Sequence, residues 1–303
     1  MKSDSQHIYL RRINAVIDHI NANLDRSHSL DELCAIAHFS KFHFHRVFKN
    51  ITGETVLAFV KRLRLERAVN LMRSAPSRSL TDVALACGFD SSSDFSRSFK
   101  QRFGFRPRDF SDERFRDDSK ICQELAAAIH YPLGHQQTAE NPDGFEAQLD
   151  HHDASNLAYV RVFGAFDAER VVTGMNQLIN WARPKSLFPQ SRLLSMSQDD
   201  METTPAEKFR LDWCLQVPDD TVGEGPVVTR RFEGGLYASV LCEGDIQLLD
   251  RAWQWLYRDW LPDSQYEPAD LPAMEWYITD PTVSGWEHFS MRCCIPIRPL
   301  RAG

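Results

Sequence analysis

The sequence lacks any apolar run that approaches the roughly 20 residues needed to span a membrane, and its polar N-terminus does not have the pattern of a signal peptide. It also lacks a Gly-x-Ser-x-Gly turn, a phosphate-binding glycine loop and a zinc-type cysteine spacing. Its seven cysteines are odd in number and irregularly spaced, as is typical of free thiols in a reducing cytoplasm. These absences predict a cytoplasmic protein without a membrane segment, cofactor or metal, and they favour a function other than catalysis.

Charge is distributed unevenly along the chain. Residues 1–116 contain 20 Lys and Arg against 13 Asp and Glu, a net charge of +7, whereas the rest contains 15 against 29, a net charge of −14. The 303 residues have room for about two domains. A basic first part joined to an acidic second part suggests that only the first part meets a polyanion.

Residues 29–110 contain the same short helix pair twice. Matching residues lie 50 positions apart before the turn and 51 after it: Ser29 and Ser79, Phe39 and Phe89, Phe44 and Phe95, Phe48 and Phe99, Gly53 and Gly104. In each copy an acidic residue, Glu32 or Asp82, follows the serine at the spacing of a capping box. A small-residue helix, a tight turn and a helix with a polar, basic outer face follow. This order predicts two helix-turn-helix motifs, whose second helices enter the DNA major groove.

The first recognition helix is expected over about residues 40–49. Its outward side chains are Lys41, Phe42, His45, Arg46 and Lys49. Arg46 suits guanine O6 and N7, a contact worth about 1–3 kcal/mol of discrimination if it is bidentate. Phe42 suits a thymine methyl or simple surface packing, and the target base of His45 stays open. His43 and His45 do not indicate a metal site, because side chains two positions apart on a helix do not converge.

The second recognition helix is expected over about residues 91–103. Its outward side chains are Ser92, Ser93, Ser96 and Arg97. Serines bond to any base or to phosphate, so this helix should read sequence weakly, with Arg97 as the exception. In an earlier packing helix, at residues 8–24, the exposed Arg11 and Arg12 are expected to reach phosphate.

A helix over residues 54–74 is expected to join the two motifs. Its 21 residues would span about 31 Å at 1.5 Å per residue, close to the about 34 Å between successive turns of one major groove. One chain could then hold both recognition helices on one face of the DNA, so we expect a monomer or a weak dimer.

This arrangement resembles the DNA-binding domain of the AraC/XylS transcription regulators over about residues 8–115. The most specific part is Gly-Phe-Asp-Ser-Ser-Ser-Asp-Phe-Ser-Arg-Ser-Phe-Lys-Gln-Arg-Phe-Gly-Phe-Arg-Pro at residues 88–107. The resemblance implies a bacterial regulator whose partners are double-stranded DNA and RNA polymerase. It places these residues on base-contacting positions: Phe42, His45 and Arg46 in the first motif, and Ser92, Ser93, Ser96 and Arg97 in the second.

The second part of the chain is expected to contain another duplication. Turn-forming residues and a short helix at 121–129 indicate a linker over 117–144. From residue 145 a repeat with a spacing of 78 follows, carried by Tyr159 and Tyr237, Val162 and Val240, Trp213 and Met291, Pro218 and Pro296. Each half reads strand, strand, helix, strand, strand, with helices at 168–181 and 246–260. We expect a multidomain protein: an all-α domain at 1–116, and an α+β domain at 145–303 with one antiparallel sheet and both helices on one face.

The second half of that domain resembles the GyrI-like (SHS2-type) effector-binding domain. The resemblance is carried by Gly235-Leu-Tyr-Ala-Ser-Val, Met274-Glu-Trp-Tyr-Ile-Thr-Asp-Pro and Ile295-Pro-Ile. It implies binding of small molecules, often aromatic or cationic, with Glu275 at the acidic position. Arg292 stands where many members carry an acidic residue, which argues against a cationic ligand and allows an anionic or neutral one. The candidate effector-binding residues are Glu275, Tyr277, Phe163, Trp213, Tyr237, Trp253 and Arg292.

Other interpretations of these residues remain open. The tryptophans are more often core residues than pocket walls, and Glu275 is equally compatible with an exposed strand edge. The domain could also hydrolyse a reactive small molecule or bind a protein. Hydrolysis would need a paired acid and base, and Glu275 has no evident second carboxylate in sequence. We therefore expect a regulator with a small-molecule effector and not an enzyme.

Overall fold

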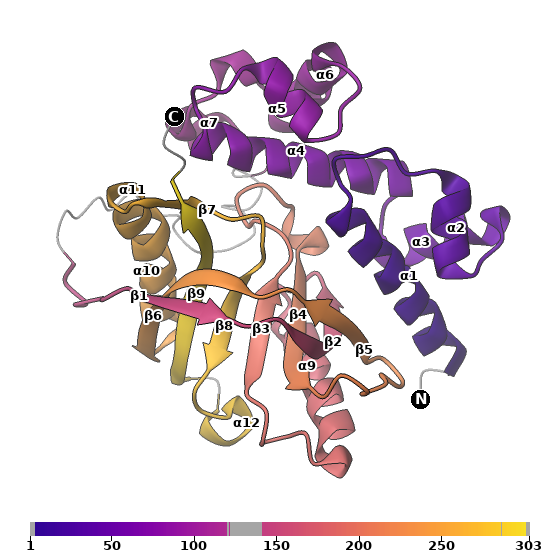
Figure 1. The fold of residues 1–303 in the computed structure, drawn as a ribbon, viewed down its shortest axis with the longest axis vertical. Coiled ribbons are helices and arrows are strands. Elements are labelled where there is room, and N and C mark those ends of the chain that lie inside the picture. Colours follow the sequence, from indigo (N-terminus) through magenta and orange to yellow (C-terminus); the bar gives the residue numbers. More distant parts are fainter. Residues whose placement is uncertain (1–3, 120, 122–140, 286, 301–303) are drawn as a thin grey trace. The chain divides into compact units, whose positions relative to one another are not determined.

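The structure, a computed structural model, describes residues 4–119, 121, 141–285 and 287–300 (Figure 1). It divides into two compact units. The helical unit contains the described residues up to 121 together with two later segments, 163–166 and 199–209, and the sheet unit contains the other described residues. Most of the predicted linker, including its helix at 121–129, lies outside the described residues. No described helix is long and apolar enough to cross a membrane.

The helical unit contains both predicted helix pairs. Its elements are α1 (Asp4–Ala22), α2 (Leu30–Ala37), α3 (Lys41–Thr52), α4 (Val56–Ser74), α5 (Leu80–Ala86), α6 (Ser92–Phe103), η1 (Pro107–Asp109) and α7 (Asp112–Asp118). The predicted linking helix is confirmed but begins two residues later, because the Thr55 side chain caps it by accepting from the Ala58 amide. Its 19 residues span about 28 Å.

Each motif has its own core, and α4 contributes to both. The N-terminal half of α4, from Val56 to Leu63, packs with α1, α2 and α3 around the fully buried Phe44 and Phe48. The C-terminal half, from Leu65 to Met72, packs with α5, α6 and α7 around a phenylalanine cluster. A single helix therefore fixes the position of one motif relative to the other within this unit.

A buried ion-pair network lies along α4. Arg62, which is only 3% exposed, donates from Nε to Glu54 Oε1 (2.9 Å) and from Nη1 to Glu66 Oε1 (3.2 Å). Arg102 of α6 also pairs with Glu66 (2.8 Å), and Asp199 of the same unit lies 3.4 Å from Arg62. The arginine can be buried because the carboxylates around it compensate its charge.

The sheet unit repeats the order strand, strand, helix, strand, strand. Its elements are β1 (Gln148–His152), β2 (Ser155–Phe163), α9 (Ala168–Ala182), η2 (Arg183–Lys185), β3 (Leu193–Ser197), β4 (Arg210–Val217), β5 (Val228–Phe232), β6 (Gly235–Gly244), α10 (Ile246–Trp255), η4 (Leu256–Trp260), α11 (Leu261–Asp263), β7 (Tyr266–Pro268), β8 (Ala273–Tyr277), α12 (Pro281–Ser284) and β9 (Phe289–Pro299); the short turn η3 (Ala206–Lys208) belongs to the helical unit. The predicted fold class is confirmed.

The strand order shows how the two halves merge into one sheet. It is β1-β6-β9-β8-β3-β4-β2-β5, with β7 added alongside β9. The halves meet where β3 pairs antiparallel with β8. The first strand of each half pairs with the second strand of the other half, β1 with β6 and β5 with β2. The central strands β3 and β8 therefore bring the two halves' side chains together at one place.

Candidate DNA interface and effector site

The first motif presents the predicted side chains on one exposed face of α3. The helix begins after Ser40 and ends at Gly53, whose φ of 76° gives the left-handed conformation that favours glycine. The side chains on the exposed face are Lys41, Phe42, His45, Arg46 and Lys49. Phe42 is 81% exposed, an unusual position for a large apolar ring. Lys41 forms an ion pair with Asp31 (2.5 Å), so part of its charge is already compensated.

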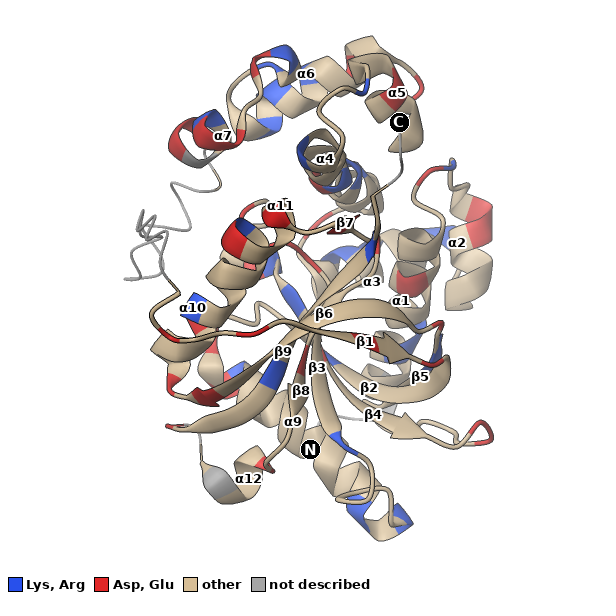
Figure 2. Ribbon diagram, turned by 60° about the vertical axis from the view of Figure 1, so that its left-hand side comes forward, with Lys and Arg blue, Asp and Glu red and all other residues tan. Residues whose placement is uncertain are grey.

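The second motif presents a less basic face on α6. Figure 2 shows that α4 and α6 both contain Lys and Arg, drawn in blue. On α6 Ser93 and Arg97 are exposed, whereas Ser92 and Ser96 are half-buried. Arg97 lies 3.8 Å from Asp94, an acidic neighbour in the first turn that the sequence interpretation did not weigh.

The two arginines of α1 have different surroundings. Both are half-buried. Both also line a shallow hollow between α1 and α2. Arg12 donates from Nη1 to the His38 carbonyl oxygen (3.1 Å), and its guanidinium lies 5.2 Å from the centre of the Phe39 ring. Arg12 thus ties α1 to the turn of the first motif.

Capping serines position both motifs. Ser29 accepts from the Glu32 amide and Ser79 from the Asp82 amide, each at 3.1 Å, as predicted. In a capping box the Glu32 carboxylate would accept from the backbone N–H of Ser29. Here it bonds instead to His19 and Arg26. These contacts, with Arg26 contributing most, lower the pKa of Glu32 to about 2.

A row of side chains crosses the centre of the sheet on one face. From β4 to β6 the paired residues are Trp213, Ser195, Glu275, Cys293 and Val240. Directly paired residues of antiparallel strands point to the same face. The Trp213 indole donates to the Val171 carbonyl oxygen of α9 (2.9 Å), and Trp253 of α10 hydrogen-bonds Glu275. Both helices therefore cover this face, as predicted.

Glu275 occupies the centre of this row, where the two halves meet. Ser195 Oγ donates to its Oε2 (2.8 Å), and the Tyr277 hydroxyl donates to the same oxygen (3.3 Å). Burial raises the pKa of Glu275, and the hydrogen bonds from Ser195, Tyr277 and Trp253 offset part of that effect. These partners are neutral, so they solvate the carboxylate without compensating its charge.

Aromatic rings surround this carboxylate. The rings of Trp213 and Tyr277 lie 5.4 Å apart, and the Trp253 ring stacks with that of Tyr257 at 6.3 Å. After Trp255 the helix changes to a π-helical turn, Leu256–Trp260, a feature frequent at functional sites. The structure thus brings together four of the predicted effector residues: Glu275, Tyr277, Trp213 and Trp253. Ser195 was missed, because its pairing with Glu275 depends on a register between distant strands.

Arg292 does not lie beside Glu275. It pairs with Trp276, the next residue along β8, and therefore points to the opposite face of the sheet. There its Nε donates to Ser239 Oγ (3.1 Å), and it also contacts Gln148. The sequence interpretation placed Arg292 in the effector site, but a shift of one residue along β9 changes the face and removes its charge from Glu275.

Tyr237 and Phe163 also lie elsewhere. Tyr237 belongs to the core on the opposite face of the sheet, and its hydroxyl donates to the Pro272 carbonyl oxygen (3.1 Å). Phe163 packs against the core of the first motif and belongs to the helical unit. Aromatic identity was the only signal for both residues, and it does not distinguish a pocket wall from a core residue.

Comparisons with known proteins match both units. A family model described as a helix-turn-helix domain matches residues 33–113, and one described as a GyrI-like small molecule binding domain matches residues 148–298. Transcriptional regulator Rob of Salmonella typhimurium is 36% identical over 88 residues, 29% of this chain and 30% of Rob. The Tn10 TetD protein of Escherichia coli is 32% identical over 107 residues, 35% of this chain and 77% of TetD.

Among solved structures, the EcmrR–DNA complex in EcmrR-RPo is 16% identical, with a TM-score of 0.45, and the match covers 84% of this chain and 99% of that chain. The two motifs on one linking helix define the AraC class of helix-turn-helix proteins. The chain belongs to this AraC-type family and contains a GyrI-like domain after its helical unit. It spans less than a third of the length of Rob.

Proposed function

We propose that this protein is a transcriptional regulator that binds double-stranded DNA through α3 and α6. The observation that carries the proposal is the shared helix α4, which contributes to both cores and holds the two motifs in one unit. Its length of about 28 Å approaches the about 34 Å between successive turns of one major groove. One chain is then sufficient for a two-groove footprint, and RNA polymerase is its further partner by family resemblance.

Footprinting of the purified full chain on genomic fragments tests this proposal. We expect protection on one face of the duplex in two stretches about one helical turn apart. The affinity should fall steeply with salt, because bound cations are released from phosphate. Affinity no greater than that of a neutral control protein at low ionic strength would refute DNA binding by this chain.

We further propose that the sheet unit binds a small cationic or amphipathic aromatic effector at Glu275. Among the described residues, the groups that contact this partly buried carboxylate are neutral, so it attracts a cation, and the neighbouring rings of Trp213, Tyr277 and Trp253 offer cation–π contacts. The displacement of Arg292 to the opposite face favours a cation over the anionic alternative. The proposed domains are 1–116 for DNA and 145–303 for the effector, joined by a linker.

Titration calorimetry with a panel of planar aromatic cations tests the site. Glu275→Gln should abolish saturable binding, whereas Asp150→Asn, which removes an acid from β1 next to Arg292, should leave it unchanged. A cation binds the ionised carboxylate, so affinity should rise with pH as Glu275 loses its proton at its raised pKa. Equal affinity of wild type and Glu275→Gln would contradict the proposal that Glu275 binds the effector.

Hydrolysis is the second candidate for this unit, and its chemistry is poorly supported. The groups bonded to Glu275 are a serine, a tyrosine and a tryptophan, none of which is a second carboxylate. Burial raises the pKa of the neighbouring Cys293 thiol, which disfavours the thiolate that a nucleophile needs. Product formation from a bound ligand would favour hydrolysis over effector binding, while binding without turnover supports an effector.

A further inference from the structure

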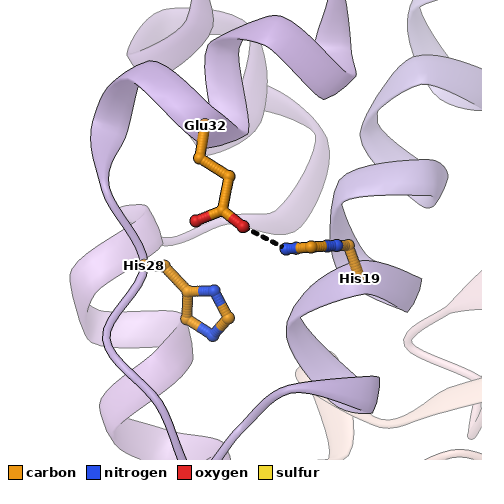
Figure 3. A group of neighbouring side chains, drawn as sticks. All are labelled: His19, His28 and Glu32. Atoms are coloured by element: carbon orange, nitrogen blue, oxygen red, sulfur yellow. Dashed lines mark hydrogen bonds and ion pairs between the residues drawn. The ribbon is translucent and has the colours of Figure 1, made fainter.

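Three side chains from three segments converge beneath the first motif. His19 of α1, His28 of the connection before α2, and Glu32 in the first turn of α2 offer ligand atoms that all lie within 4.8 Å of one another (Figure 3). His28 and Glu32 are four residues apart, but His19 belongs to the preceding helix, so only the fold brings the three together, and no metal site was predicted from the sequence. Two imidazoles and one carboxylate are the donor set of many zinc sites that keep a position open for water.

His28 is placed in this cluster without another evident role. Neither of its ring nitrogens has a hydrogen-bond partner among the described residues, although both are buried. A buried polar group without a partner costs free energy, so such a group calls for an explanation.

The contacts around His19 are mutually incompatible as hydrogen bonds. Its Nε2 lies 2.8 Å from Glu32 Oε1 and 3.1 Å from Arg26 Nη2. The nitrogen must carry a proton to donate to Glu32, but it must lack one to accept from Arg26. A metal ion removes this conflict, since it accepts lone pairs from the nitrogen and the carboxylate together.

We propose that His19, His28 and Glu32 bind a divalent transition metal of the zinc class. Arg26 Nη2, 2.7 Å from Glu32 Oε1, provides the positive charge there in the metal-free protein. Arg26 lies in the connection after α1 and its side chain is 45% exposed, so it can swing into solvent when the metal binds.

Small side-chain movements complete the site. Ligands at about 2.0–2.1 Å in a tetrahedron are separated by about 3.3 Å, so the three donor atoms must close from their spread of up to 4.8 Å. Rotation of the unpartnered His28 ring provides this closure. The bound metal joins α1 to α2 and so stabilises the first motif without occupying its exposed recognition face.

Zinc titration of the metal-free full chain, against a competing chelator, tests the proposal. One equivalent should bind to wild type and be weakened at least about tenfold by His28→Ala or Glu32→Gln. His43→Ala, which removes an exposed histidine of α3, is the matched control and should bind zinc like wild type. Arg26→Gln removes the competing cation and should bind zinc more tightly than wild type.

Further readouts separate this site from others on the chain. Cobalt substitution should give ligand-field absorption without thiolate charge transfer, since no cysteine belongs to the cluster. Zinc should raise the Tm of wild type but not that of His28→Ala, which is expected to fold because neither ring nitrogen has a hydrogen bond to lose. Unchanged zinc affinity in both His28→Ala and Arg26→Gln, or thiolate absorption from the bound cobalt, would overturn the proposal.

Discussion

The two helix-turn-helix motifs have the same internal frame but different outer faces. In both, a serine caps the first helix, and a left-handed residue forms the turn: His38 at φ 50° and Gly88 at φ 80°. Matching phenylalanines, such as Phe48 and Phe99, are fully buried in their separate cores. The two copies thus share capping and turn residues at the surface and phenylalanines in the core.

The exposed faces differ in size and charge. The first has Phe42 and Arg46 exposed, whereas the second has serines, two of them half-buried, and Arg97 near Asp94. A duplicated scaffold can therefore keep its core while its outer residues change, because the outer residues contribute little to packing. We expect the first motif to read bases and the second mainly to hold phosphates.

The largest effect should come from breaking the shared frame. Phe48→Ala and Phe99→Ala each leave a cavity in a separate core and should lower the free energy of unfolding by about 3–5 kcal/mol. Hydrogen exchange of the full chain should show each loss mainly in its own motif. Equal loss of protection in both motifs from one substitution would mean that α4 makes them a single cooperative unit.

Substitutions on the exposed faces of α3 and α6 test whether the first motif reads bases and the second mainly contacts phosphates. Arg46→Ala should weaken binding to a footprinted site by about 1–3 kcal/mol and relax preference at one base pair. Ser93→Ala should cost less than about 1 kcal/mol at every base pair, as expected for a neutral hydrogen bond. Fluorescence anisotropy with single-base variants of the site, at fixed salt, measures both.

Arg11→Ala is the control for the recognition-face variants. It should weaken all duplexes alike and reduce the salt slope by about one. If Arg46→Ala also weakens every sequence equally, the assignment of α3 to base readout fails.

The matching turn positions, His38 and Gly88, can be tested by opposite substitutions. An alanine at Gly88 would place Cβ 2.6 Å from the Leu24 carbonyl oxygen in a left-handed conformation, so Gly88→Ala should destabilise by about 1–2 kcal/mol. His38→Gly removes strain at the matching position and should stabilise by about 0.5 kcal/mol. Thermal unfolding of both variants checks the opposite signs; destabilisation by His38→Gly would show that its side chain contributes more than its backbone strain costs.

Local patterns in the sequence were sufficient for most of the fold. Spacing predicted the helices, the capping serines and the two sheet halves, because each depends on neighbours a few residues away. The face on which a strand residue lies relative to a distant strand could not be predicted. One residue of register decides whether Arg292 or Cys293 lies beside Glu275. Ser195 became a partner of Glu275 for the same reason.

Glu275 in the effector site and Glu32 in the first motif should have opposite effects on stability, because their pKa values are shifted in opposite directions. The raised pKa of Glu275 means that its ionised form is less favourable in the folded protein than in the unfolded chain. Its presence therefore lowers stability as pH rises above its ordinary value of 4.5. Glu275→Gln should be at least as stable as wild type at neutral pH, with the gain disappearing in acid. A loss of stability at pH 7 would indicate a structural role for the carboxylate.

Glu32 should show the smallest effect and the reverse pH dependence. Its pKa falls to about 2, chiefly through the hydrogen bond to Arg26, so its stabilising contribution is present above 4.5 and is lost as pH falls toward 2. Glu32→Gln should therefore lower the stability of the first motif at neutral pH, and wild type and variant should converge in acid. The effect should shrink with added salt, because the pair with Arg26 is exposed and screened. Denaturant unfolding from pH 7 to pH 3, with Asp82→Asn as the matched variant of the second motif, measures the difference. A Glu32→Gln effect that does not shrink between pH 7 and pH 3 would assign the contribution of Glu32 to packing and not to its charge.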